Sequence, residues 1–173
     1  EFMKEYFNEL IISAGGVKGG YFIGALEVLN QFYPIKNFKY LTGSSAGSVI
    51  CTLINIGYTI QEIKEIFVNI EFDTFFELKL SQFIQNGSFN SGQKIHNLIK
   101  SIFITKHISP DITFLELFNK TNIYLCVNTV NISSGKITYF NYTNYPGFKV
   151  IDALLMSINI PYIFPYKEIN NEI

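Results

Sequence analysis

The chain has no tryptophan, no arginine and only two cysteines among its 173 residues. Two cysteines are too few for a disulfide framework. Because Cys51 and Cys126 both lie in apolar segments, we expect buried free thiols and a reducing, intracellular setting. The formal net charge of −1 gives no electrostatic footprint for nucleic acid, so a nucleic-acid partner is not expected.

Long apolar runs are also missing, and no run reaches the roughly 18 residues that span a bilayer. The N-terminus lacks the charged-then-apolar layout of a signal peptide. These absences predict a cytoplasmic or intracellular protein without a transmembrane segment. We interpret Glu1-Phe2, ahead of Met3, as a cloning remnant. Residues 1–173 are enough for a single domain with a sizeable core.

Predicted strands alternate with predicted helices along the chain. Strands are expected over 9–13, 38–42, 123–130 and 137–141, the last two forming a hairpin. Helices are expected over 20–32, 46–56, about 92–104 (capped by Asn90 or Ser91) and 151–158, and a further helix after Thr59 carries Ile63, Ile66 and Phe67 on one face. Residues 113–119 are expected to form a short helix or turn, and Pro161 and Pro165 an extended segment. Thr59 and Glu62 form a capping box at the start of the third helix. This order predicts a three-layer α/β/α domain with a mostly parallel central sheet.

The most informative motif is Gly43-Ser44-Ser45-Ala46-Gly47, directly after the second strand. A strand followed by G-x-S-x-G predicts a nucleophile elbow, in which a sharp turn presents one hydroxyl at a helix N-terminus. The glycines lack a Cβ, which lets the turn close. Ser45 is therefore the candidate nucleophile, and an ordinary helix-capping serine is the alternative.

A second glycine-rich loop, Ala14-Gly15-Gly16-Val17-Lys18-Gly19-Gly20, follows the first strand. Bare backbone N–H groups ahead of a helix can bind a developing oxyanion. The loop fits neither G-x-G-x-x-G nor the P-loop pattern, because Tyr21 stands where a P-loop needs lysine. Lys18 either adds positive potential or is a solvated loop charge. The two motifs together indicate acyl-ester hydrolysis.

Other groups are weaker candidates for catalysis. Asp73 with His96 or His107 has the order of a Ser-His-Asp triad, but neither histidine follows a predicted strand. Asp152 is better explained by a helix first turn, and Asp111 by a surface turn. Acyl-carrier transferases commonly have histidine before the elbow serine, where this chain has Ser44. The aromatic stretch 72–90 predicts either core packing or a lid facing a membrane.

These residues resemble the patatin-like phospholipase family. The resemblance runs over roughly residues 9–173 and includes Gly57-Tyr58-Thr59, Gly87-Ser88-Phe89, Asp152-Ala153-Leu154 and Ile160-Pro161-Tyr162-Ile163-Phe164-Pro165. It implies a Ser–Asp dyad that hydrolyses lipid acyl esters with no metal or other cofactor. By position, Ser45 is the nucleophile, Gly15 and Gly16 supply oxyanion N–H groups, and Val17, Lys18 and Gly19 complete the loop. Ala14 stands where the family has its first glycine.

The largest departure from the family is the absence of an Asp-Gly pair anywhere in the sequence. The resemblance places the catalytic Asp after the Pro161–Pro165 segment, so we expect the domain to continue beyond Ile173 and the 173-residue chain to be inactive. Expected substrates are phospholipids or lysophospholipids met at a membrane surface. An incomplete sheet also predicts self-association. A non-catalytic module that binds acyl lipids is the alternative function.

Overall fold

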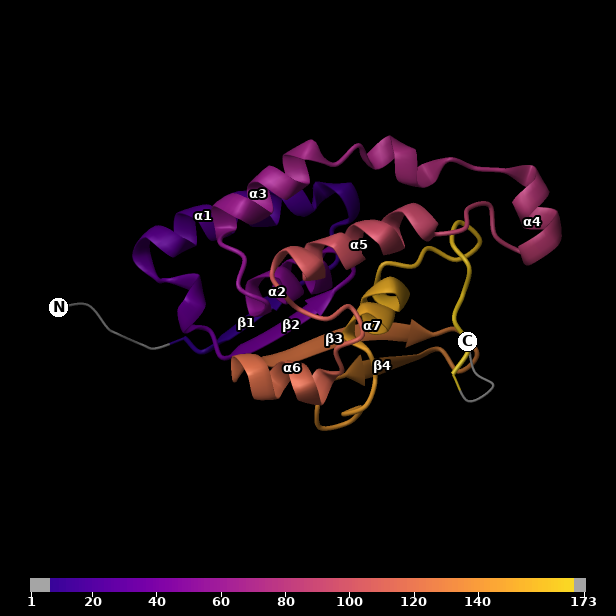
Figure 1. Ribbon diagram of the computed structural model, residues 1–173. Helices are drawn as coiled ribbons and strands as arrows, with labels where there is room; N and C mark the ends of the chain where they lie inside the picture. The colour runs from indigo at the N-terminus through magenta and orange to yellow at the C-terminus, as the bar shows by residue number, and fades with distance from the viewer. Residues whose placement is uncertain (1–6, 170–173) are drawn as a thin grey trace.

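The computed structural model describes residues 7–169, apart from the side chains of Phe76 and Asn86. Figure 1 shows four strands side by side in the order β1-β2-β3-β4. The strands are β1 (Glu9–Ile12), β2 (Tyr40–Ser44), β3 (Tyr124–Asn131) and β4 (Lys136–Phe140). The first three are parallel and β4 is antiparallel to β3, so the expected α/β class with a mostly parallel sheet is confirmed. The proposed cloning remnant at 1–2 and the segment 171–173 lie outside the described residues.

Helices fill the connections between the strands. The α-helices are α1 (Gly20–Phe32), α2 (Ala46–Asn55), α3 (Ile60–Asn69), α4 (Leu80–Asn86), α5 (Gln93–Thr105), α6 (Phe114–Thr121) and α7 (Val150–Ser157). Short 3-10 helices are η1 (Gly16–Gly19), η2 (Ile35–Asn37) and η3 (Phe72–Phe76). Every helix expected from the sequence is present, with bounds that differ by one or two residues at most ends.

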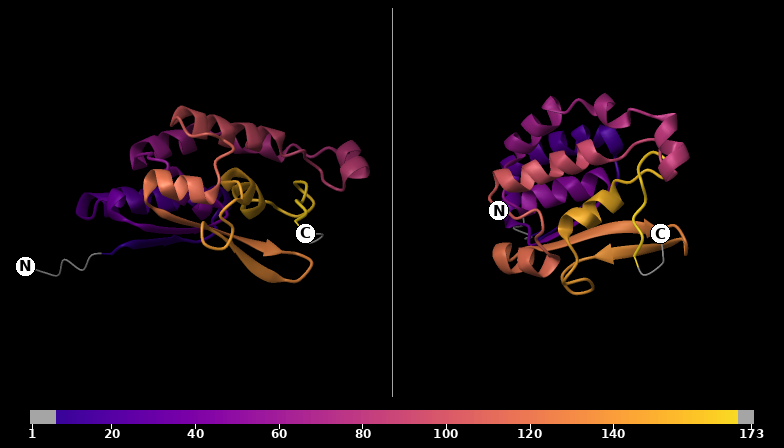
Figure 2. Two further views of the ribbon diagram at one scale, coloured as in Figure 1. Left: turned by 60° about the horizontal axis from the view of Figure 1, so that its bottom comes forward. Right: turned by 45° about the vertical axis from the view of Figure 1, so that its right-hand side comes forward.

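One face of the sheet carries the core. Leu41 and Val127 on this face are fully buried, and α2 and α7 make most of the contacts between helices and strands. In the left view of Figure 2 the helices stand above the sheet. The opposite face keeps Ile11, Val130 and Ile137 more than half exposed. The described part of the chain therefore forms two layers, helices over one face of a sheet, rather than the three layers predicted from the sequence.

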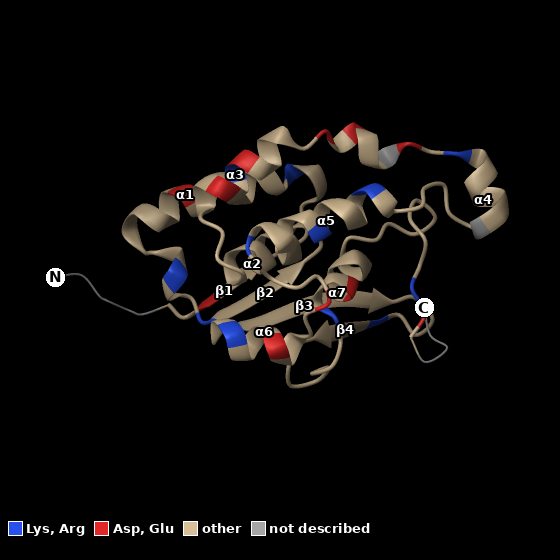
Figure 3. Ribbon diagram, viewed as in Figure 1, with Lys and Arg blue, Asp and Glu red and all other residues tan. Residues whose placement is uncertain are grey.

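Ion pairs and caps fix the outer helices. Figure 3 shows acidic residues along α1 and α3, and between these two helices Lys64 Nζ bonds the Glu27 carboxylate at 2.9 Å. The capping box predicted for Thr59 and Glu62 is confirmed. A second capping box joins Thr113 to Glu116 at the start of α6.

Three local predictions were wrong. The second strand begins at Tyr40 rather than residue 38, because 35–37 form η2 and Phe38 closes that turn. The N-cap of α5 is Gly92, in a left-handed conformation, rather than Asn90 or Ser91, although the side chains of those two residues accept the N–H groups of Gly92 and Gln93. The segment at Pro161 begins as a turn rather than an extended strand, since Ile163 N–H and Phe164 N–H both donate to the Ile160 carbonyl.

The aromatic stretch 72–90 is packed in one part and exposed in another. Phe83 and Phe89 are partly buried and stack with ring centroids 4.4 Å apart. Leu78, Leu80 and Ile84 remain 58–78% exposed beside them, on the α4 segment that projects at one end of the molecule (Figure 1). Among the described residues no helix is both long and apolar enough to cross a membrane.

Glu62 gives the fold a dependence on pH. A hydrogen bond from Lys106 Nζ at 2.7 Å and one from the Thr59 N–H lower the Glu62 pKa from 4.5 to about 2. A lowered folded-state pKa stabilises the fold above about pH 4.5, and this contribution is lost as pH falls toward 2. The carboxylate side chain is 41% exposed, so solvent screening limits the contribution to about 1 kcal/mol.

We therefore expect Glu62→Gln to lower the free energy of unfolding by about 1 kcal/mol at pH 7 and to flatten its decline between pH 5 and 2. Urea unfolding at a series of pH values measures both effects. Glu65→Gln, on the same helix but bonded to Gln61 rather than to a lysine, is the matched control. Identical acid profiles for the two variants would contradict the assignment to Glu62.

Candidate functional site

The two glycine motifs meet at one edge of the sheet. Strands β1 and β2 are parallel neighbours, with Ile12 opposite Gly43 at their carboxyl ends. The chain leaves β1 through the glycine loop into η1 and α1, and it leaves β2 through Ser45 into α2. Ligand sites of open α/β sheets commonly lie beyond these carboxyl ends. The topology therefore brings the predicted nucleophile and the predicted anion-binding loop together.

Ser45 has a backbone conformation that side chains rarely adopt. Its φ is 50° and its ψ is −122°, and it forms the N-cap of α2. The turn is held by Ser48, whose N–H and hydroxyl both donate to the Ser45 carbonyl, at 2.9 and 2.6 Å. Such strain costs about 1–3 kcal/mol and concentrates at functional sites. A strained residue between a strand and a helix is the backbone geometry that the elbow prediction requires.

The flanking glycines permit close backbone packing, as the motif predicted. A Cβ added to Gly47 would lie 2.2 Å from the Ile12 carbonyl oxygen and 2.6 Å from that of Ser13. A Cβ on Gly43 would lie 2.4 Å from the Ser48 Cα. No side chain fits at such distances. The first turn of α2 is therefore seated directly on the end of β1.

The glycine loop lies against the same turn. Gly19 is buried, and a Cβ at that position would be 3.2 Å from the Ala46 Cβ. The left-handed φ of +52° falls on Gly16, so Ala14, which is not among the residues with positive φ, needs no glycine-like conformation. Gly16 and Val17 begin η1, and the first N–H groups of a helix have no acceptor within it. The Lys18 side chain is exposed on this loop.

A residue that the sequence analysis missed also touches the elbow. The backbone N–H of Ser45 donates to Ser157 Oγ at 2.8 Å, and Ser157 Oγ donates to the Asn128 carbonyl at 2.7 Å. Ser157 is the last residue of α7, in the run Leu154-Leu155-Met156-Ser157-Ile158. A single hydroxyl inside an otherwise apolar run was the only sequence signal for this contact.

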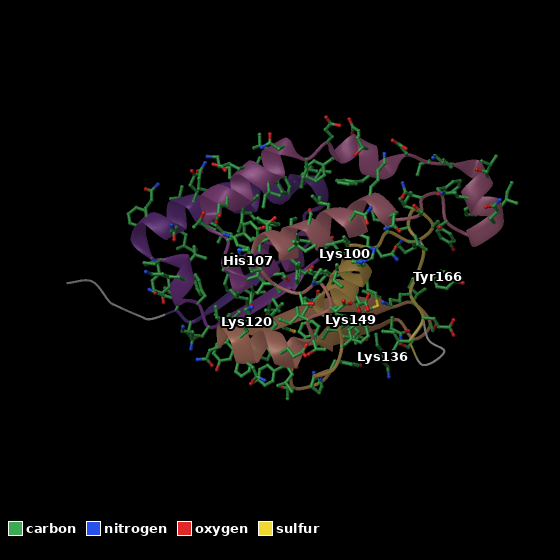
Figure 4. All side chains as sticks on the ribbon, in the orientation of Figure 1. Lys100, His107, Lys120, Lys136, Lys149 and Tyr166 are labelled. Carbon is green, nitrogen blue, oxygen red and sulfur yellow. The ribbon has the colours of Figure 1, made fainter. Side chains whose placement is uncertain are left out.

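Within the described residues no hydrogen bond joins the Ser45 hydroxyl to a histidine or a carboxylate. His96 lies within α5. His107 follows α5 with φ 56°, and Lys120 donates to its carbonyl at 3.4 Å (Figure 4). Asp152 is in the first turn of α7 and pairs with Lys167 at 2.5 Å, and Asp111 pairs with Lys149 at 2.6 Å. The arrangement of these groups does not support the Ser-His-Asp alternative.

Neither cysteine is a good candidate for a nucleophile. Both are free and buried, as the sequence predicted. Burial raises the pKa of the Cys51 thiol to about 12 and also raises that of Cys126. Thiols that stay protonated at neutral pH are weak nucleophiles. The described residues also contain no group of three or more His, Cys, Asp or Glu side chains placed to hold a metal ion.

A pocket of about 510 Å³ adjoins the elbow. Ser44 and Ser157 line it on the side of the site, and the Oδ1 atoms of Asn128 and Asn159, two further lining residues, have no hydrogen-bond partner within the described structure. Most of its other lining is apolar, with Val130, Ile137, Phe140, Tyr145, Met156 and Ile169. A pocket of this size and lining is suited to part of an apolar ligand.

Comparison with known proteins places this arrangement in a family. The family model described as "Patatin-like phospholipase" matches residues 10–173. "Probable lipid hydrolase 463L" of Invertebrate iridescent virus 6 is 33% identical over 174 residues, which cover 96% of this chain and 58% of the viral protein. "Triacylglycerol lipase 5" of Saccharomyces cerevisiae is 27% identical over 176 residues, which cover 90% of this chain and 22% of the yeast protein.

The fold is shared with solved structures. That of VipD from Legionella pneumophila superposes with a TM-score of 0.70 at 15% identity, over 92% of this chain and 43% of VipD. The chain thus spans little more than half, or less, of each of these proteins. The family model covers nearly all of the chain, and we conclude that the chain belongs to the patatin-like phospholipase family.

Proposed function

We propose that the protein hydrolyses acyl esters of lipids with Ser45 as the nucleophile. The observation that carries this proposal is the strained backbone of Ser45, φ 50° and ψ −122°, packed against the glycine loop. A helix-capping serine has no need of such a conformation, whereas an elbow needs it to present its hydroxyl. The names of the viral and yeast relatives, a probable lipid hydrolase and a triacylglycerol lipase, support the substrate class.

The proposed reaction has two steps. Ser45 Oγ attacks the ester carbonyl carbon while its proton passes to a general base, and the ester C–O bond then breaks as the alcohol leaves with a proton. The product of this step is an acyl ester of Ser45. Water then attacks that ester, a fatty acid is released, and the Ser45 hydroxyl is restored. The partial positive charge at the N-terminus of α2 favours the developing negative charge.

We assign the oxyanion hole to the loop of Gly15, Gly16, Val17, Lys18 and Gly19. The Ser45 N–H is already bonded to Ser157, so the donors come from elsewhere. The first N–H groups of η1, in the loop whose Gly19 lies against Ala46, are suited to this role. Gly43, Ser44, Ala46 and Gly47 form the elbow around the nucleophile. The proposal needs no metal and no other cofactor.

We assign the general base to an Asp outside these 173 residues. None of the described carboxylates bonds Ser45, and the sequence holds no Asp-Gly pair of the kind that the family resemblance implies. Under this proposal the 173-residue chain alone hydrolyses lipids at a rate close to that of the uncatalysed reaction. Phospholipids or lysophospholipids at a membrane surface are the proposed substrates, and the exposed Leu78, Leu80 and Ile84 are apolar contacts available to such a surface.

The test is fatty-acid release from phosphatidylcholine and lysophosphatidylcholine vesicles. It compares the natural full-length protein, its Ser45→Ala variant and the 173-residue chain. We expect release only by the full-length protein with Ser45 in place. Full activity in Ser45→Ala would refute the nucleophile. An inert full-length protein that still retains radiolabelled lysophosphatidylcholine would instead favour the alternative, a non-catalytic module that binds acyl lipids.

A further inference from the structure

We infer that Ser157 is a positioning residue for the nucleophile, an inference that rests on the proposed function. Its hydroxyl is the only described side-chain group that bonds the backbone N–H of Ser45. The same oxygen donates to the Asn128 carbonyl on β3 at 2.7 Å. A single hydroxyl thus links the elbow, the last turn of α7 and the third strand of the sheet.

The bond replaces a sheet contact that the elbow cannot make. The ladder between β2 and β3 ends at the pair Ser44 and Asn128, and beyond it Ser45 turns away from the sheet with φ 50°. A backbone N–H at a partly buried turn needs an acceptor. Ser157 Oγ supplies that acceptor at 2.8 Å, just past the point where β3 stops pairing with β2.

The hydrogen bond to Ser157 means that Ser45 is held at both its N–H and its carbonyl. Ser48 holds the Ser45 carbonyl through two hydrogen bonds, at 2.9 and 2.6 Å, and Ser157 holds the Ser45 N–H. The two peptide planes that flank Ser45 therefore each have a fixed partner. The φ and ψ angles of Ser45 set the direction of its side chain. Loss of the hydrogen bonds from Ser48 or of the one to Ser157 therefore permits the hydroxyl to move. A misplacement of about 1 Å can cost about 100-fold in rate.

The side chain at position 157 must accept a hydrogen bond from the Ser45 N–H and donate one to the Asn128 carbonyl. Threonine keeps a hydroxyl of this kind, and its extra methyl group can enter the pocket of about 510 Å³ that Ser157 lines. Alanine has no such group, and a cysteine thiol is a weak donor and a weak acceptor. The order of activity expected for the variants is therefore Thr above Cys above Ala.

The experiment measures kcat and KM of the full-length protein with p-nitrophenyl butyrate, well below the unfolding temperature of each variant. We expect Ser157→Ala to lower kcat about 10- to 100-fold with KM changed less than about 3-fold, and Ser157→Thr to retain kcat within about 3-fold. Ser101→Ala is the matched control, because Ser101 is exposed on α5 and its hydroxyl bonds only the carbonyl of Leu98 in its own helix.

The outcomes separate this inference from the proposed function. If Ser45→Ala retains activity, the nucleophile assignment is wrong and the role of Ser157 is refuted with it. If Ser45→Ala is inactive while Ser157→Ala keeps the wild-type kcat, only the positioning role is refuted. Should Ser157→Ala fail to fold, Ser157→Cys takes its place, and equal kcat values for Cys and Thr would overturn the inference.

Discussion

Replacing Ser45 with glycine is expected to abolish lipid hydrolysis and at the same time to leave the fold more stable than Ser45→Ala does. Both variants lack the hydroxyl, so we expect each to lose at least about 10³-fold in kcat in the full-length protein. Only glycine adopts φ 50° and ψ −122° without strain. We expect the glycine variant to exceed the alanine variant by about 1 kcal/mol in free energy of unfolding, after allowance for glycine's greater backbone entropy in the unfolded chain.

The control for this comparison is Asn122→Gly. Asn122 also has a positive φ, of 53°, but with ψ 30° it occupies the ordinary left-handed region, which asparagine tolerates. We expect a change of only a few tenths of a kcal/mol there. Urea unfolding of the variants measures the stabilities, and fatty-acid release measures the activity. A Ser45→Gly protein no more stable than Ser45→Ala would show that the elbow stores no strain.

The second large effect is expected for Gly47→Ala, which inserts a methyl group between α2 and β1. The new Cβ would lie 2.2 Å from the Ile12 carbonyl oxygen and 2.6 Å from that of Ser13. Both are backbone atoms of the sheet edge, which cannot move without disturbing β1. We expect a loss of about 3 kcal/mol in free energy of unfolding, at the upper end for overpacking. Activity of the folded fraction of the full-length protein should fall too, because the elbow and the glycine loop are forced apart.

Gly24→Ala provides the matched substitution. Gly24 lies inside α1, and an added Cβ would meet nothing within 4 Å. Alanine in an exposed helix interior stabilises by about 0.5–1 kcal/mol relative to glycine. The two substitutions are therefore expected to change the urea midpoint in opposite directions. A Gly47→Ala protein as stable as wild type would mean that the helix can withdraw from β1 at little cost.

Local signals in the sequence predicted most of the elements. The Thr59–Glu62 capping box, the hairpin between β3 and β4 and the break at Pro34 each depend on residues only a few positions apart. The turn at Ser45 was predictable for the same reason, since G-x-S-x-G has glycines at the positions where an added Cβ would lie only 2.2–2.6 Å from backbone atoms. A short motif is enough to predict a turn when the close contacts that require its glycines are made within the turn and with a nearby strand.

Contacts between distant segments were not predictable in this way. Ser157 is 112 positions from Ser45, and neither periodicity nor turn chemistry relates two residues so far apart. The displacement of β2 to Tyr40–Ser44 has a similar origin, because its pairing with β1 and β3, rather than its own apolar pattern, sets its limits. The exposure of Ile11 and Val130 also depends on which distant segments pack on that face of the sheet. Residues close in sequence do not determine this.

The bond between Ser45 and Ser157 has a consequence for the order in which the molecule folds. Contacts between residues far apart in sequence form late, because chain closure must come before they stabilise anything. Strand β2 can pair fully only after β3 has been made, since Tyr40 pairs with Tyr124. The hydrogen bond from Ser45 to Ser157 can form only later, because Ser157 is the last residue of α7. During synthesis from the N-terminus, the turn at Ser45 emerges early but is locked only after residue 157 leaves the ribosome. Under this order the turn of a nascent chain lacks its bond to Ser157 until all four described strands have been synthesised.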